Sequence, residues 1–243
     1  LGRYAVVRPD GSDAAPTWFN LGDRDLATHF YRTARLAEGA SLTEVSAEIG
    51  RAWKLRLALL PMTDSPFRTL VTLADGNQVV SFQDYFVRLR HGVPIAAIAF
   101  DHDGAELTAE ARAAIDTSDA VVIAPSNPLV SVAPIRALPG VDALLAARRG
   151  SVVAISPIVD GSALKGPAAR MLAELAFAPS VVSIARLYAP IAATLVIDTA
   201  DAHRALAVEA EGVRCVVVPT VMSPPGRARD LAFTCLAALD RTL

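Results

Sequence analysis

The sequence contains little sulfur and little lysine. Its 243 residues include two cysteines, Cys215 and Cys235, and two lysines, Lys54 and Lys165. The cysteines lack the spacing of metal ligands, and two alone do not form a disulfide framework, so we expect buried thiols in a reducing compartment. Arginine therefore supplies nearly all of the positive charge.

Long apolar runs are also absent. Hydrophobic residues make up 53% of the chain, but no run approaches the roughly 20 residues that cross a bilayer, and no secretory signal opens the sequence. We expect a cytoplasmic protein with no membrane partner. The net charge is −2, from 23 basic and 25 acidic residues spread along the chain, which argues against a nucleic-acid-binding protein.

Several common catalytic signatures are missing as well. The sequence has no G-x-x-x-x-G-K-[ST] phosphate loop, no G-x-G-x-x-G dinucleotide loop, no G-x-S-x-G elbow and no H-E-x-x-H zinc motif. No two of its 14 glycines are adjacent. The standard P-loop, dinucleotide-binding, hydrolase and metalloprotease classes are therefore excluded.

Short runs of valine, isoleucine and alanine alternate with amphipathic stretches along most of the chain. This alternation predicts one α/β domain over residues 1–243, a Rossmann-like, three-layer α/β/α fold whose mostly parallel sheet has at least five α/β repeats. The expected strands are Leu57–Met62, Ile95–Phe100, Ala120–Ala124, Val152–Ile155, Thr194–Ile197 and Val213–Val218. The expected helices are Arg24–Glu38, a helix that begins at Ser41, Thr108–Thr117, Val141–Arg149, Pro167–Phe177, Ala200–Ala210 and Arg227–Leu239.

Two local patterns refine this prediction. Ser41 and Glu44 have the spacing of a capping box, and the apolar face of the helix that follows comprises Leu42, Val45, Ile49 and Trp53. Within about residues 57–90 we expect a small β-hairpin insertion or a sheet edge, with Thr69–Leu73 and Val79–Phe82 as its strands. Gln83–Arg90 either continues the second strand or forms a short helix.

Ligands of an open parallel sheet bind at the carboxyl ends of its strands, so the residues that follow each strand are candidates. After the strand at 120–124, two prolines, Pro125 and Pro128, stiffen a loop in which Ser126 presents a hydroxyl and Asn127 an amide, groups suited to a phosphate or a base. In the alternative interpretation, Asn127 bonds its own backbone in an Asx turn.

A second candidate loop follows the strand at 152–155. It contains Ser156 and leads to Lys165 and Gly166 before a helix that opens with proline. Lys165 therefore stands at a helix N-terminus, where exposed N–H groups and an ammonium together neutralise a phosphate. A solvated loop lysine is the alternative.

The third candidate is the turn that opens the first helix, Gly22-Asp23-Arg24-Asp25. Arg24 is able to clamp a phosphate, and Asp23 or Asp25 to hold a divalent cation. Alternatively, Asp23 caps the helix and Asp25 complements its dipole. We interpret His29 as structural and the segment at His102 and Asp103 as a turn, whereas Asp64 and Arg68 are candidates to reach the site.

Several segments, in one order, closely resemble the 2-phospho-L-lactate transferase family, whose bacterial members include phosphoenolpyruvate transferases. Five ordered motifs are far more specific than any one alone. These five motifs are Trp18–His29, Leu60–Asp64, Ala124–Pro128, Ser156–Ile158 and Ala163–Pro167. The resemblance continues through Ala185–Tyr188, Val196–Asp198 and Pro219–Met222.

This resemblance implies a transferase of coenzyme F(420) biosynthesis. Such an enzyme moves a phospho-lactyl or phospho-enolpyruvyl group from a guanosine-diphosphate-linked donor to a deazaflavin precursor, 7,8-didemethyl-8-hydroxy-5-deazariboflavin, and releases GMP. The resemblance also implies Mg²⁺ and a homodimer. By position, Gly22, Asp23, Arg24 and Asp25 are assigned to the acceptor and metal region. The loops with Ser126, Asn127, Pro128, Ser156, Lys165 and Gly166 are assigned to the donor.

The family pattern normally begins with a strand and a G-G-x-G-G loop, followed by an Asn-x-Gly-Asp-Asp loop. Neither pattern occurs in this sequence, so we expect this chain to lack the N-terminal part of the family domain, including carboxylates that bind the metal. Two other functions stay open. One is a nucleotide-sugar-binding regulator of the same fold, and the other is a catalytically silent scaffold.

Overall fold

The computed structural model describes residues 21–163 and 166–239, and the carboxyl-terminal part of this range folds around a parallel sheet. Its strands are β4 (Val121–Ile123), β5 (Val152–Ile155), β8 (Thr194–Ile197) and β9 (Arg214–Val217). They pair in the order β4-β5-β8-β9, and every pair is parallel. The alternating pattern therefore predicted the class of this fold correctly.

Successive residues of the central strands enter different cores. Val152 and Ala154 of β5 belong to the larger core, whereas Val153 and Ile155 pack with Leu231 and other residues beneath α9 (Arg227–Leu239). Helices therefore cover both faces of the sheet, which confirms the three-layer arrangement. The other helices of this region are α3 (Ala109–Thr117), α4 (Ala133–Arg136), α5 (Val141–Ala147), α6 (Ala168–Glu174), α7 (Val181–Tyr188) and α8 (Ala205–Glu209), with short helices η2 (Pro128–Val132), η3 (Arg149–Ser151) and η4 (Thr199–Arg204).

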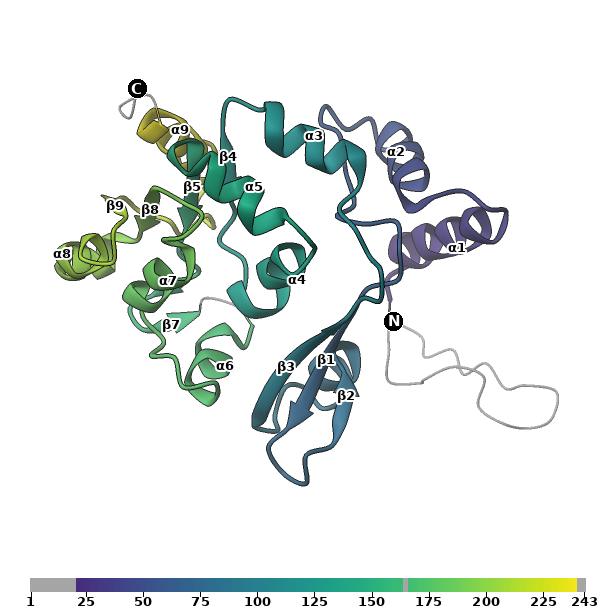
Figure 1. Cartoon of the computed structure of the whole chain (residues 1–243), viewed down its shortest axis with the longest axis horizontal. Helices are drawn as coiled ribbons and strands as arrows, with labels where there is room; N and C mark the ends of the chain where they lie inside the picture. Colours follow the sequence, from purple (N-terminus) through teal and green to yellow (C-terminus); the bar gives the residue numbers. More distant parts are fainter. Residues whose placement is uncertain (1–20, 164–165, 240–243) are drawn as a thin grey trace.

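A separate antiparallel sheet contains β1 (Arg68–Leu73), β2 (Val79–Ser81) and β3 (Ile95–Asp101), in the order β2-β1-β3. In Figure 1 it projects away from the parallel sheet. The predicted hairpin is confirmed, and 84–88 forms a short π-helix, η1 (Asp84–Arg88). The expectation that Ile95–Phe100 joins the parallel repeats is wrong, because this strand runs antiparallel to β1.

The expected strand at Leu57–Met62 is also wrong. This segment has no regular structure, although the Thr108 N–H and Oγ1 donate to the carbonyl oxygens of Met62 and Pro61 at 3.0 and 3.1 Å. Pro61 has no N–H for a sheet ladder, and Leu57 and Leu59 are exposed. The parallel sheet described here therefore has four strands in place of the expected five or more.

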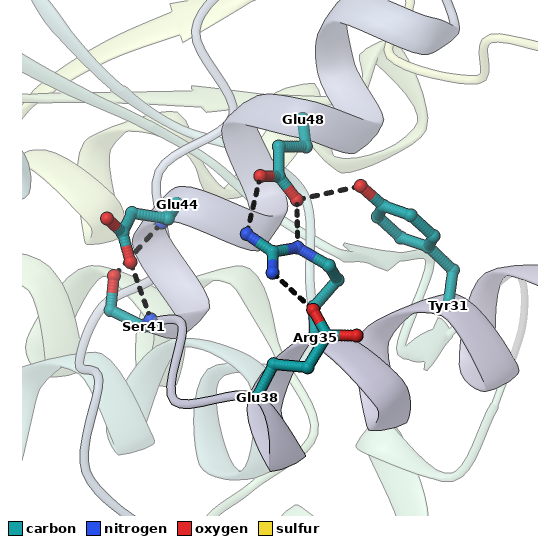
Figure 2. A network of polar contacts seen from close by, with 6 residues as sticks. All are labelled: Tyr31, Arg35, Glu38, Ser41, Glu44 and Glu48. Carbon is teal, nitrogen blue, oxygen red and sulfur yellow. Dashed lines mark hydrogen bonds and ion pairs between the residues drawn. The ribbon is translucent and has the colours of Figure 1, made fainter.

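Two helices, α1 (Asp23–Ala37) and α2 (Leu42–Ala52), pack against each other in the amino-terminal part of the described residues. The capping box of Ser41 and Glu44 is confirmed. Figure 2 shows how Arg35 of α1 contacts Glu38 and the α2 residue Glu48, to which Tyr31 also donates.

Two expectations for these helices fail. The N-cap of α1 is Gly22 rather than Asp23, and the carboxylate of Asp23 accepts instead from the adjacent Arg24 N–H. Val45 is buried as expected, but Trp53, the C-cap that follows the last helical residue Ala52, is 60% exposed.

Membrane-spanning character is weak in the described ranges. No single helix there is long and apolar enough to cross a bilayer. One pair, Pro128–Arg136 with Val141–Ala147, meets the criteria of length and composition only when both are counted together across an 89° bend.

Candidate functional site

A cleft of about 570 Å³ lies where the strands of the parallel sheet end. Residues that follow β4, β5 and β9 line it, together with the first residue of α6. Parallel strands end at the same edge of a sheet, which explains how segments far apart in the sequence meet here. The lining residues are Pro125, Asn127, Ser156, Pro157, Val159, Ala168, Thr220, Val221, Met222 and Ser223.

The loop after β4 contributes Pro125 and Asn127 to the cleft. The Oδ1 atom of Asn127 accepts from the Leu129 N–H at 2.9 Å, which caps η2, so the Asx-turn interpretation describes this oxygen. Its Nδ2 has only a long contact, 3.7 Å, to the sulfur of Met171 among the described residues. The amide N–H groups of Asn127 are therefore the part of this side chain that a ligand can use.

Two neighbours of Asn127 have structural positions. Pro128 is buried and begins η2, where its missing N–H costs nothing. The Ser126 N–H donates to the Ala124 carbonyl oxygen at 2.6 Å, and Ser126 is not among the residues that line the cleft.

The loop after β5 begins at Ser156, whose side chain is 2% exposed. Its hydroxyl accepts from the Ile158 N–H at 3.1 Å and donates to the Ile158 carbonyl oxygen at 3.0 Å. The chain then forms a hairpin of β6 (Ile158–Val159) and β7 (Ser162–Ala163), which the sequence did not predict. Ser156 thus shapes the cleft while its hydroxyl is bound internally.

The third wall, Thr220–Ser223, follows β9. The sequence reasoning quoted Pro219–Met222 as a shared motif but gave it no role in the site. Asp198, directly after β8, holds this wall, since its Oδ2 accepts from the Thr220 N–H and Oγ1 at 2.7 and 3.0 Å. Asp198 and Thr220 follow β8 and β9, so their place after a strand is the sequence signal that marks them.

The Asp198 carboxylate is buried yet ionised at neutral pH. Burial opposes ionisation, but the hydrogen bonds from the Ala200 N–H and from Thr220 outweigh it and hold the pKa of the Asp198 carboxyl below its ordinary value. No charged side chain is among the described residues that line the cleft.

The remaining predicted site residues lie elsewhere. The turn Gly22–Asp25 is not part of the cleft lining, and its two aspartates and Arg24 are exposed. Gly166 is described and has a positive φ of 75°, but it does not line the cleft either. Lys165 and Trp18–Asn20, which open the first motif, lie outside the described residues.

The secondary candidates have structural contacts. Asp64 accepts from the N–H and hydroxyl of Thr43 at 2.7 and 3.1 Å, near the start of α2. Arg68 lies 3.9 Å from Asp101 in an exposed ion pair. The His102 ring stacks on Phe67 with centroids 5.2 Å apart, next to a turn at 103–104 as expected.

His29 contacts a residue of its own helix. Its Nδ1 lies 2.8 Å from Arg32 Nη2. Both residues are on α1, which agrees with the interpretation of His29 as structural.

The described residues do not build a metal site by themselves. They contain no group of three or more histidine, cysteine, aspartate or glutamate side chains placed to bind one ion. One carboxylate of the predicted pair, Asp23, already accepts from a backbone N–H. Among the described residues, therefore, no side-chain cluster would hold a cation by itself, and we derive no step through Mg²⁺.

Comparison with known proteins decides the family. Residues 5–222 match the family described as 2-phospho-L-lactate transferase CofD. The chain belongs to this family. It is 37% identical over 230 residues to the phosphoenolpyruvate transferase of Kitasatospora aureofaciens, covering 93% of this chain and 72% of that protein. It is 34% identical over 236 residues to the Mycobacterium leprae enzyme of the same name, covering 95% and 68%.

The fold comparison agrees with this membership. The crystal structure of protein BH3568 from Bacillus halodurans has a TM-score of 0.62 and covers 96% of this chain and 76% of its own, at 15% identity. At that identity the likeness concerns the fold alone. Membership of the CofD family makes the chain a transferase of coenzyme F(420) biosynthesis, as the ordered motifs indicated.

Proposed function

We propose that this CofD-family chain transfers a phospho-enolpyruvyl or phospho-lactyl group from a guanosine-diphosphate-linked donor to the ribityl hydroxyl of the deazaflavin precursor, and releases GMP. The proposal rests on the family match and on relatives named phosphoenolpyruvate transferase. The observation that carries it is the cleft at the carboxyl ends of the parallel strands.

The size of the cleft and two of its polar side chains support a nucleotide ligand. Its volume, about 570 Å³, falls within the range of small-molecule sites. Asn127 offers amide N–H groups, Ser223 a hydroxyl, and prolines stiffen two of the loops. We assign the donor's diphosphate and base to this cleft, with Ser156 shaping the wall and Lys165 supplying positive charge from the segment before α6.

The transfer balances without any further reactant. The acceptor hydroxyl oxygen attacks the phosphorus that carries the enolpyruvyl or lactyl group, and a new P–O bond forms. The bond from this phosphorus to the bridging oxygen breaks, and GMP leaves with its electron pair. The proton of the hydroxyl passes to solvent or to a base. Hydrogen-bond donors that the protein holds in place before the reaction stabilise the charge on the leaving phosphate.

We also propose that Gly22, Asp23, Arg24 and Asp25 serve the acceptor, that Mg²⁺ assists, and that the protein is a cytoplasmic homodimer. These assignments follow the resemblance. Light scattering of the purified protein tests the homodimer, and titration of activity with Mg²⁺ after chelation tests the metal.

Mass spectrometry of a complete reaction tests the transfer itself. The full-length protein receives the deazaflavin precursor, Mg²⁺ and each guanylylated donor, and we expect GMP and the phosphodiester in equal amounts. Thermal shift separates the rival function, because binding stabilises a folded protein. Stabilisation by GMP or GDP supports the transferase, whereas a response only to UDP-sugars, without product, would support the regulator. No response to either ligand would favour the scaffold.

A further inference from the structure

Two buried carboxylates follow β8 and hold two walls of the cleft. Asp198 is 6% exposed, and Asp201, on η4, is 1% exposed. Neither residue lines the cleft, but each accepts a hydrogen bond from a segment that does. Because the cost of burying a carboxylate must be offset by bound donors, such groups fix the backbone that supplies those donors.

The carboxylate of Asp198 accepts four hydrogen bonds. Its Oδ2 accepts from the Thr220 N–H and Oγ1, and its Oδ1 accepts from the Ala200 N–H at 3.0 Å and from Thr199 Oγ1 at 3.2 Å. None of the four donors is a cation. Asp198 therefore acts as a fixed acceptor that joins the end of β8 to the segment after β9.

Among the described residues, the segment that Asp198 holds makes few other backbone hydrogen bonds. After β9 ends, the Val218 N–H donates to the Ile197 carbonyl oxygen at 3.1 Å, and residues 218–223 have no regular secondary structure. Thr220 is 4% exposed and is the first of four successive residues that line the cleft. Its two bonds to Asp198 thus fix the wall at the residue where the wall begins.

Asp201 does the same for the hairpin after β5. Its Oδ2 accepts from the Asp160 N–H at 2.9 Å. Asp160 and Gly161 form the two-residue turn between β6 and β7, with φ values of 50° and 70°, as a type I′ turn requires. Val159, directly before this turn, lines the cleft. Asp198, the N-cap of η4, and Asp201, within η4, therefore support two walls.

We propose that Asp198 is a positioning residue for the donor site: it holds the wall Thr220–Ser223 in the conformation that binds the donor nucleotide. This inference rests on the proposed function. A wall that is ordered before binding loses little entropy when the ligand arrives, so loss of the support weakens binding of the donor more than it slows the chemical step. Asp201 has the corresponding role for the hairpin.

The test is Asp198→Asn in the full-length protein. The amide of asparagine presents a donor or an acceptor to Thr220, but it cannot accept hydrogen bonds from all four groups. The wall therefore loosens, while the volume of the side chain is conserved. We expect the KM for the guanylylated donor to rise about tenfold, with kcat changed less than about threefold and the KM for the deazaflavin unchanged. Glu211→Gln, a change of carboxylate to amide at a surface ion pair with Arg186, is the matched control and should leave all three values unchanged.

A second pair of variants covers the case in which Asp198→Asn does not fold. Thr220→Val removes only the hydroxyl bond, and we expect a smaller rise in donor KM. Thr220→Ser keeps both bonds and should restore the donor KM towards the wild-type value. A folded Asp198→Asn protein with unchanged donor KM, or equal values for the two Thr220 variants, would overturn the inference.

Hydrogen exchange separates this inference from the proposed function. The Thr220 amide should exchange faster in Asp198→Asn than in the wild type without any ligand, because its acceptor is altered. If the wild type makes no GMP, the proposed function fails. The inference about the donor site then fails with it, even if hydrogen exchange confirms that Asp198 holds Thr220. If the wild type is active and exchange at Thr220 is unchanged, the inference alone fails.

Discussion

Arg35 on α1 donates to both carboxylate oxygens of Glu48 on α2, from Nε and Nη2, each at 3.0 Å. The same carboxylate accepts from the Tyr31 hydroxyl at 2.8 Å (Figure 2). No residue of α1 is buried, and this bidentate contact joins α1 to α2.

The first prediction concerns the pH dependence of this contact. Hydrogen bonds from Arg35 and Tyr31 lower the pKa of Glu48 from about 4.5 to about 2. Because the pKa of Glu48 is lower in the folded state than in the unfolded state, the ionised carboxylate stabilises the folded protein at pH values above about 4.5. This stabilisation disappears as the pH falls from about 4.5 to about 2. Glu48→Gln should therefore be less stable than the wild type near neutral pH, and the difference should vanish towards about pH 2.

Denaturant unfolding at several pH values measures this difference. Glu38→Gln is the control, because Glu38 contacts the same guanidinium at 2.5 Å but its side chain is 62% exposed. Its effect should be smaller at every pH. Equal effects of the two substitutions would contradict the prediction.

The second prediction concerns Ser156. Its hydroxyl binds both backbone polar groups of Ile158, and both residues are buried. Ser156→Ala leaves these groups without that partner, which should cost about 1–3 kcal/mol of stability. Thr117→Ala is the matched control, since its hydroxyl also donates to a carbonyl oxygen, that of Ala113, but at the surface. Urea unfolding measures both, and equal losses would disagree with the role given to Ser156.

The third prediction concerns the attachment of the antiparallel sheet. The Glu174 carboxylate on α6 accepts from the Ile95 N–H at 3.0 Å and lies 2.8 Å from Arg170 Nε. Arg170 in turn donates to the Tyr85 hydroxyl and the Val93 carbonyl oxygen. Glu174→Ala should increase amide exchange within β1–β3 while the parallel sheet keeps its protection. Faster exchange in both sheets would show that they do not open separately.

The fourth prediction concerns the thiols. Cys235 is fully buried, and burial raises the pKa of Cys215 to about 11. Near pH 8 only about one Cys215 thiol in a thousand is then ionised, and the thiolate is the reactive form. Both cysteines should react with a disulfide reagent slowly in the native protein and rapidly in denaturant. Fast native labelling of either cysteine, located by peptide mapping, would refute this prediction.

The sequence predicted the elements that have strong local signals. The capping box at Ser41, the hairpin around Gly76 and the buried strands Val152–Ile155 and Thr194–Ile197 are all confirmed. Buried parallel strands are continuously apolar, and this pattern cannot be confused with an exposed face. The sequence pattern of Ile95–Phe100 is the same for a parallel strand and for an antiparallel strand. Its antiparallel pairing therefore depends on tertiary contacts, which the local sequence does not reveal.

For the site, reasoning from strand ends located Asn127 and Ser156 in the cleft but not how their polar atoms are used. An Asx turn and a ligand site require the same residue types, so only the structure separates the Oδ1 of Asn127 from its Nδ2. The role of Asp198 depends on a partner 22 residues away along the chain. The roles of Asp23, Arg24 and Asp25 at the acceptor and metal region stay predictions.

The antiparallel sheet begins and ends at paired residues, Arg68 and Asp101, which face each other in its register. Such partners lie only about 5 Å apart. The chain therefore leaves the body of the protein and returns to it at almost one point. A change in length at the outer turns of this sheet would therefore leave the spacing of the parallel strands beneath the cleft unaltered, whereas its contacts with α6 constrain the residues around Tyr85 and Ile95.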